Sequence, residues 1–167
     1  MGKEVEIKHI IISDAVGIYT FQFADKPQTE FMDFMCRFKD VEDWLVKNDF
    51  HRIVKMIDKI SQEGAYERLF RTSEGRMRDN VVAIPLITLP RKNHDTLRLY
   101  CLRLSDQILI IGNGGIKQQK YNGNPEIEQS IQDLANLEQE INKYIRSKRI
   151  ALDGVKIIID ERVRIKL

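Results

Sequence analysis

Basic side chains concentrate in the middle of the chain, where their types and spacing could serve chemistry on a phosphate backbone. Between residues 68 and 103 there are eight Lys or Arg residues and only three acids. The basic ones are Arg68, Arg71, Arg76, Arg78, Arg91, Lys92, Arg98 and Arg103, and Lys117, Lys120 and Tyr121 follow. A basic surface on a sheet suits nucleic acid. The alternative is an ordinary solvated sheet face, because a charge run alone is a weak signal.

One strand-like run, LRLYCLRL, carries two of these side chains in a pattern that a plain core strand does not need. Successive side chains of a strand point to opposite faces, so Arg98 and Tyr100 share a face that Leu99 does not. The pair could be an ordinary cross-strand contact. It could also place a permanent cation and a phenol beside a scissile phosphate.

The segment GNGGIK, residues 112–117, is rich in glycine. Its spacing matches neither a P-loop nor a dinucleotide fingerprint. Such glycines indicate either a bulge or an irregular strand end. A functional alternative is that they let the backbone approach a ligand while Lys117 reaches in.

The remaining polar residues narrow the chemistry. His94 lies in the basic segment RKNHD, where an imidazole could serve acid–base work near neutral pH. Cys36 and Cys101 lie far apart and without the spacing of metal ligands, and the carboxylates are scattered singly. We therefore expect no disulfide scaffold, no metal site and no cofactor.

Length and composition indicate one ordinary domain spanning residues 1–167. The chain has 167 residues, 43% of them apolar, and a net charge of +2, which neither implies nor excludes nucleic acid. The charged N-terminus lacks the apolar core of a signal peptide, and no apolar run reaches 18 residues. The expectation is a protein of the cytoplasm with no membrane segment.

Hydrophobic periodicity predicts an α+β fold. Apolar residues at helical spacing predict helices over 29–39, 49–62 and 125–147, begun by Thr29, ended by Gly64 and capped by Asn124, respectively. Short β-rich runs at 66–71, 80–88, 97–104 and 107–112 predict an antiparallel meander of three or four strands, with Pro85 at an edge or a bulge.

The two ends of the chain are predicted to form β-hairpins. Strands at 4–12 and 18–23 form the first hairpin, within residues 1–24. Residues 149–167 contain the second, which turns at Asp153-Gly154, and a last strand, RVRIKL. We expect the helices of 29–62 to pack on one face of the sheet. Whether the terminal hairpins pair with each other or extend the central sheet stays open.

Three strings, RIVKMIDKISQEGAYERLFR, VVAIPL and LRLYCLRLSDQILIIGNGGIK, together resemble the RelE/HigB-like toxins of toxin–antitoxin pairs. The resemblance covers about residues 30–130. Its most specific features are a strand that begins with Arg98 and carries an aromatic residue, and a following apolar strand that ends in a Gly- and Lys-containing turn.

The resemblance implies an mRNA endonuclease that acts in the ribosome without a metal, by attack of the substrate's own 2′-hydroxyl on the adjacent phosphate. By position, Arg98, Lys117 and either Lys120 or Tyr121 match its catalytic cluster. The RNA-binding set would be Arg76, Arg78, Arg91, Lys92, His94 and Tyr100. The implied partner is a small antitoxin of helix-turn-helix type. The alternative is a non-catalytic binding module of the same fold, either a ParE-like inhibitor or a degenerate toxin.

Strand register makes this expectation specific. A hairpin that turns at Ser105-Asp106 places Arg98 opposite about residue 113 and Lys117 just beyond the end of the strand that carries Arg98. We expect Arg98, Lys117 and Tyr121 to line one basic groove with Arg76 or Arg78. The apolar stripe of helix 125–147 is expected to be buried in the same domain, and would be a partner site if it were exposed.

Overall fold

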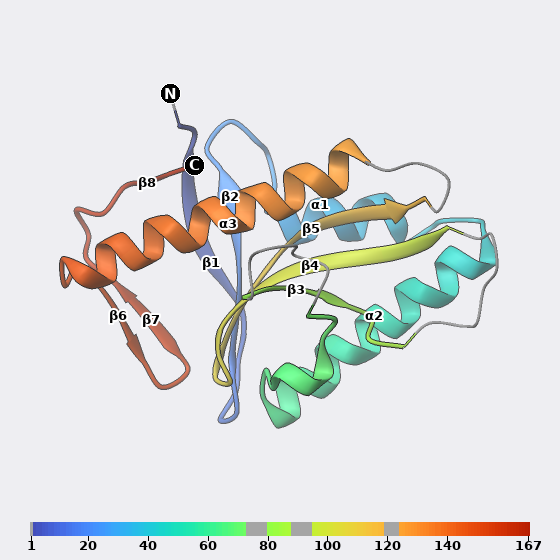
Figure 1. Ribbon diagram of the computed structural model, residues 1–167, viewed down its shortest axis with the longest axis horizontal. Helices are drawn as coiled ribbons and strands as arrows, with labels where there is room; N and C mark the ends of the chain where they lie inside the picture. Colours follow the sequence, from blue (N-terminus) through green and yellow to red (C-terminus); the bar gives the residue numbers. More distant parts are fainter. Residues whose placement is uncertain (1, 73–79, 88–94, 119–123) are drawn as a thin grey trace.

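The computed structural model describes residues 2–72, 80–87, 95–118 and 124–167 (Figure 1). In chain order the elements are β1 (Glu4–Ile12), β2 (Gly17–Phe23), α1 (Glu30–Phe38), α2 (Trp44–Glu63), the short 3₁₀ helix η1 (Glu67–Leu69), β3 (Val81–Ile84), β4 (Thr96–Ser105), β5 (Ile108–Lys117), α3 (Pro125–Arg146), β6 (Ile150–Asp153), β7 (Lys156–Ile159) and β8 (Ile165–Lys166). The predicted α+β class is confirmed.

One sheet of six strands organises the molecule, in the order β3-β4-β5-β2-β1-β8. The β3-β4-β5 meander is antiparallel, as predicted. The exception in this sheet is the β2–β5 pair, which is parallel and runs only from Gly17–Tyr19 against 108–110. The N-terminal hairpin thus extends the meander through β2, one of the two alternatives that the sequence left open.

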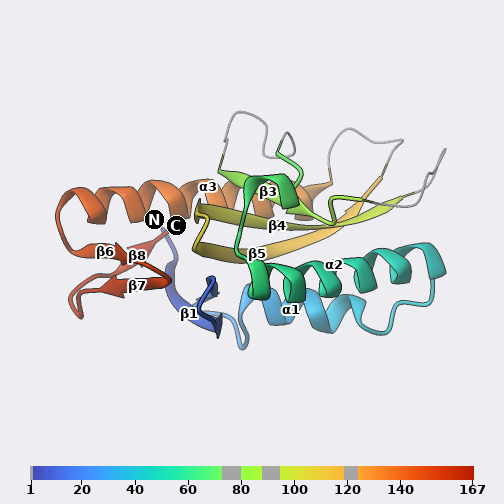
Figure 2. The same cartoon turned by 90° about the horizontal axis from the view of Figure 1, so that it is seen from below.

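The sheet is the middle of three layers, because helices cover both of its faces (Figure 2). Helices α1 and α2 pack on one face and bury a cluster that includes Phe34, Ile53 and Leu99. Helix α3 packs on the other face, where Leu134, Leu137 and Tyr100 belong to a second cluster. Burial of both faces explains why the strands of the meander are almost wholly buried.

The helix boundaries follow from side-chain caps. Thr29 accepts a hydrogen bond from the Met32 amide and starts α1, as predicted. Helix α2 begins at Trp44 rather than at 49, because the carboxylate of Asp43 accepts from the amides of residues 45 and 46. Gly64, at φ 114°, ends α2, a conformation that other residues rarely adopt.

One predicted β segment takes another form, and a second is a shorter strand than predicted. Residues 66–71 are not a strand: η1 occupies the middle of the run, at Glu67–Leu69, and only Arg71 forms an isolated bridge, to Ala83. Strand β3 is an edge strand that ends at Ile84, directly before Pro85, in agreement with the edge position expected for this proline.

The C-terminal region divides between two sheets. Strands β6 and β7 form a separate hairpin, whose two-residue turn is Gly154-Val155, one residue later than predicted. The run RVRIKL is a strand only at 165–166, where β8 pairs with β1 at Glu4 and Val5. Within the ranges that the structure describes, no helix is both long enough and apolar enough to cross a membrane.

Candidate functional site

The three predicted site residues that the structure describes lie on β4 and β5, and two of them are buried. Arg98 has 5% of its surface exposed and Tyr100 has 1%, whereas Lys117 is exposed at the end of β5. Tyr100 belongs to the core beneath α3, and strand alternation places Arg98 on the same face. Their predicted shared face is therefore found, but it is a covered face and not a solvated surface.

Lys117 lies on this face too, one step along the ladder from Arg98. Directly paired residues project to the same face of a sheet, and Arg98 pairs with Gly115 while Lys117 pairs with Thr96. Arg98 and Lys117 are therefore diagonal neighbours, a relation that spans about 7–8 Å between Cα atoms. The structure brings these two predicted residues together.

The predicted register was wrong by two residues. Ser105 pairs with Ile108, so the hairpin turns at Asp106-Gln107 and not at Ser105-Asp106. Moving the turn by one residue shifts the register by two, which puts Gly115 opposite Arg98 where we expected 113, whereas bulges reduce the difference to one residue at 101–103. Strand β5 consequently continues to Lys117, so this lysine is inside the ladder rather than beyond its end.

The glycine-rich segment, residues 112–117, lets β4 and α3 pack closely against β5. Leu99 pairs with Gly114 and Cys101 with Ile111, so Gly112 and Asn113 form a bulge opposite the single residue Tyr100. A Cβ on Gly114 would lie 1.9 Å from the carbonyl oxygen of Arg98. A Cβ on Gly115 would lie 2.8 Å from a carboxylate oxygen of Glu126 on α3. The sequence offered two structural interpretations of GNGGIK, a bulge and an irregular strand end, and the bulge is the one observed.

The other predicted site residues lie outside the described residues: Lys120, Tyr121, Arg76, Arg78, Arg91, Lys92 and His94. Two of the segments that contain them, residues 88–94 and 119–123, lie next to the paired ends of β4 and β5 along the chain. Thr96 opens β4 soon after residues 88–94, Lys117 closes β5 shortly before residues 119–123, and Thr96 and Lys117 face each other across the ladder.

A polar cluster that the sequence analysis missed joins α1, β5 and α3, with Arg37 at its centre. The guanidinium donates to Asp33 Oδ2 (3.0 Å), Asn113 Oδ1 (2.5 Å), the Gly114 carbonyl (2.9 Å) and Glu126 Oε2 (3.1 Å). The helical spacing of Asp33 and Arg37 was a visible signal for the first contact. Nothing in the spacing of the sequence signals the contacts to β5 and α3.

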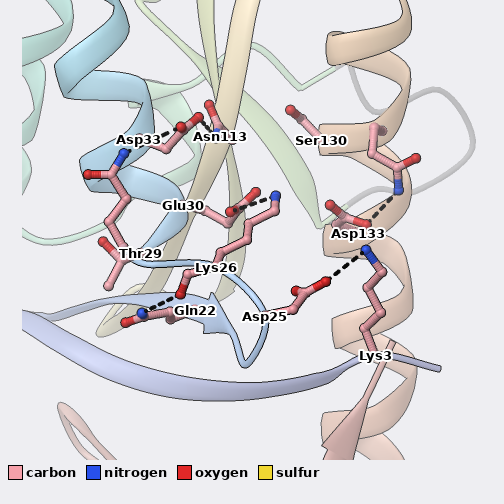
Figure 3. A network of polar contacts seen from close by, with 12 residues as sticks. Lys3, Gln22, Asp25, Lys26, Thr29, Glu30, Asp33, Asn113, Ser130 and Asp133 are labelled. Atoms are coloured by element: carbon pink, nitrogen blue, oxygen red, sulfur yellow. Dashed lines mark hydrogen bonds and ion pairs between the residues drawn. The ribbon is translucent and has the colours of Figure 1, made fainter.

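Beside this cluster lie two buried carboxylates, Glu30 of α1 and Asp133 of α3, with 3% and 7% of their surfaces exposed (Figure 3). Lys26 Nζ lies 3.3 Å from Glu30 Oε2. We call this set, Lys26, Glu30 and Asp133, the polar crevice.

Burial dominates the electrostatics of the polar crevice. It raises the pKa of Glu30, against the opposing effect of the Lys26 charge, and the negative charge of Asp133 adds to the rise. Burial likewise raises the pKa of Asp133, although Gln129 donates a 2.7 Å hydrogen bond to it. For Asp33 burial acts in the same direction, but hydrogen bonds from Asn113 and Arg37 outweigh it and hold the pKa below its ordinary value.

Raised carboxylate pKa values occur at both catalytic and structural sites, so the shift alone assigns no role to Glu30 and Asp133. No group of three or more His, Cys, Asp or Glu residues suited to a metal ion occurs in the described part of the chain.

The apolar stripe of α3 is covered by the sheet. Ile127, Leu134, Leu137 and Ile141 each have 8% or less of their surface exposed. Ile131 and Ile145 of the stripe are partly buried against the same cluster, so the stripe is buried within the domain, as expected.

Comparison with known proteins adds no relative: no family model, curated protein or solved structure matches the chain.

Proposed function

We propose that this protein is the toxin of a toxin–antitoxin pair, a metal-independent ribonuclease that cleaves mRNA in the ribosome. The observation that carries the proposal is the placement of Arg98 and Lys117 as diagonal neighbours on one sheet face. These are the two described residues that match the catalytic cluster of the RelE/HigB-like toxins. The proposal places the protein in the cytoplasm, with a small helix-turn-helix antitoxin as its partner.

In the proposed reaction the 2′-hydroxyl of one nucleotide attacks the phosphorus of the adjacent phosphodiester. The phosphorus–5′-oxygen bond breaks, which leaves a 2′,3′-cyclic phosphate and a 5′-hydroxyl. A base removes the proton of the 2′-hydroxyl and an acid protonates the leaving oxygen, for which Lys120, Tyr121 and His94 are the candidates. Lys117 is exposed and neutralises the charge that develops on the phosphate oxygens.

Arg98 cannot act by direct contact with RNA in this conformation, because 95% of its surface is covered. Its Nη1 donates to the Leu97 carbonyl at 3.2 Å. We assign it a positioning role, in which it holds the end of β4 that pairs with the Lys117 end of β5.

The second candidate function is a non-catalytic binding module of the same fold. The burial of Arg98 and Tyr100 is the observation in its favour, since a core strand needs no access to a substrate. The two candidates differ in whether Lys117 is required for activity.

The test is growth of bacteria after induced expression of the chain. Under the proposal, the wild-type chain stops growth, Lys117→Ala restores it, and Lys55→Ala, which removes an exposed lysine from α2, does not. Equal amounts of folded protein must be present, as measured by immunoblot of the soluble fraction. If Lys117→Ala stops growth as strongly as wild type, the binding module replaces the ribonuclease as the better account.

A further inference from the structure

Positive charge concentrates at the end of the molecule where α3 finishes and the last residues of the chain return to it. Residues 143–149 and 160–167 contain seven Lys or Arg residues and only two acids, Asp160 and Glu161. All seven basic side chains are exposed.

Hydrogen bonds hold these two segments side by side. The Tyr144 hydroxyl donates to the Arg164 carbonyl (2.9 Å), and the Asp160 amide donates to the Arg149 carbonyl (2.9 Å). Folding therefore joins the charges at the end of α3 to those at the end of the chain.

Most of these cations are available to a ligand. Two have a carboxylate nearby: Lys143 lies 3.9 Å from Glu140, and Arg164 lies 3.7 Å from Glu4. None of the other five forms an ion pair within the ranges that the structure describes. We call these five the C-terminal basic cap: Arg146, Lys148, Arg149, Arg162 and Lys166.

The needs of the helix end explain only part of this charge. Arg146 lies in the last turn of α3, where the helix dipole favours a cation. Lys148 follows the helix with a φ of 63°, and its amide donates to the Ile145 carbonyl (3.0 Å), at a position that usually holds glycine. A side chain in this conformation is strained, so the stability of the helix end does not account for a lysine there.

The C-terminal basic cap lacks the groups that most ligands other than a duplex backbone require. Helices that bind a membrane surface and protein interfaces rely on exposed apolar or aromatic anchors, and single RNA strands rely on aromatic side chains that stack on bases. In residues 143–149 and 160–167, all of which the structure describes, no large apolar or aromatic side chain is exposed. The phosphate backbone of a duplex requires only positive charge.

The C-terminal basic cap also lies far from the proposed ribonuclease site. Helix α3 has 22 residues and is therefore about 33 Å long. Its first turn lies against the end of β5, where a Cβ on Gly115 would touch Glu126, and its last turn lies at the opposite end of the molecule (Figure 1). The molecule has room for a single strand near Lys117 and a duplex at the other end.

We propose that the C-terminal basic cap binds the phosphate backbone of an RNA double helix, without regard to its sequence. The choice of RNA over DNA rests on the proposed function, because the ribosome consists largely of RNA helices. The cap then docks the protein on ribosomal RNA while Lys117 acts on the mRNA. Its cations displace counterions from the RNA, so affinity falls steeply as the salt concentration rises.

The probe is a fluorescent RNA duplex of mixed sequence and about 16 base pairs, without ribosomes. Its binding to the full chain is followed by anisotropy over a series of KCl concentrations. If all five cations contact phosphates, the slope of log Kd against log salt concentration should be roughly 4.5. Lys148→Gly/Arg149→Ala should lower this slope by about 2 and weaken binding by about tenfold or more at physiological salt. Lys47→Ala/Lys55→Ala removes the same charge from α2 and should leave the slope as in wild type.

The single variant Lys148→Gly separates binding from folding. Glycine adopts the φ of 63° without strain, so this variant should melt a few degrees higher than wild type. Its salt slope should nevertheless fall by about 1. A lysine with a purely structural role would show no such loss.

The proposal fails if wild type does not bind the duplex, if Lys148→Gly/Arg149→Ala keeps the full slope, or if Lys47→Ala/Lys55→Ala loses as much. Tighter binding of a DNA duplex of the same sequence would overturn the choice of RNA. Vesicles of equal parts phosphatidylcholine and phosphatidylserine, bound as tightly as the RNA duplex, would assign the C-terminal basic cap to a membrane surface instead. Lys117→Ala should bind the duplex as wild type does, so this result is separate from the success or failure of the ribonuclease proposal.

Discussion

Arg98 and Lys117 project from adjacent strands onto the same face of the sheet, one as a buried cation and the other as an exposed one. The pairing of Arg98 with Gly115 and of Thr96 with Lys117 produces this diagonal relation. The first prediction tests whether the buried Arg98 guanidinium is needed for activity.

Arg98→Met should abolish growth inhibition while the protein stays folded. Methionine preserves most of the length and apolar stem of the side chain but removes the charge, so packing beneath α3 is largely kept. Growth after induction and the amide spectrum of the purified variant are the two measurements. Full growth inhibition by a folded Arg98→Met variant would exclude any role of the Arg98 charge.

Arg37→Ala should lower the free energy of unfolding by about 2 kcal/mol, because one charged side chain that bonds α1, β5 and α3 is lost. Urea denaturation followed by circular dichroism measures the change. Lys39→Ala, at an exposed position directly after α1, is the control and should change stability by less than about 0.5 kcal/mol. Equal effects of the two substitutions would contradict the assigned role of Arg37.

The glycine at the close approach of β4 and β5 should tolerate no side chain. Gly114→Ala places a Cβ 1.9 Å from the Arg98 carbonyl oxygen, so the strands must separate, at a cost of about 3 kcal/mol or more. Gly154→Ala, in the open β6–β7 turn, meets nothing within 4 Å and carries only the strain of its φ of 59°, about 1 kcal/mol. The ranking would be refuted if thermal unfolding found Gly114→Ala the more stable of the two.

The polar crevice should give the protein a distinctive dependence on pH. An acid whose pKa is raised by folding binds its proton more tightly in the folded than in the unfolded state. Stability therefore decreases as pH rises from the ordinary pKa of the group through its higher folded value, and increases when pH falls through the same window.

Asp133→Asn removes this cost, since the amide has no charge to bury. The variant should melt a few degrees higher than wild type at pH 7, and the difference should shrink as pH falls from the raised folded pKa of Asp133 to the ordinary aspartate value. Asp58→Asn, at an exposed position on α2, is the control and should show no such trend. A variant that is less stable than wild type at pH 7 would mean that the Asp133 charge is favourable in place.

Local patterns in the sequence were sufficient to predict the presence of the three helices and of the β3-β4-β5 meander. The spacing of Phe31, Phe34, Met35 and Phe38 predicted α1, and Asn124 before Pro125 predicted the start of α3. These signals are carried by neighbours along the chain. Strand pairing between distant segments has no such signal, and the parallel contact of β2 with β5 was not predicted.

The candidate site depended on details that a hydrophobic pattern does not contain. The turn at Asp106-Gln107 could not be distinguished from one at Ser105-Asp106, although a single residue decides what faces Arg98. Arg98 and Tyr100 are buried because α3, the next element after the β4–β5 hairpin, covers their face of the sheet. Glu30, Asn113 and Asp133 come from three separate elements, so the contacts around Arg37 and the polar crevice appear only in the folded chain.

The most direct test of the proposed ribonuclease is the chemistry of RNA ends. Purified protein would be incubated with ribosomes bound to a defined mRNA, in a buffer that keeps the ribosome intact, and the new ends would be identified by their ligation and phosphorylation behaviour. The account predicts cleavage that yields 2′,3′-cyclic phosphate and 5′-hydroxyl ends, present with wild type and Lys55→Ala and absent with Lys117→Ala. An mRNA left uncut by wild type, or new ends that carry a 5′-phosphate, would contradict it.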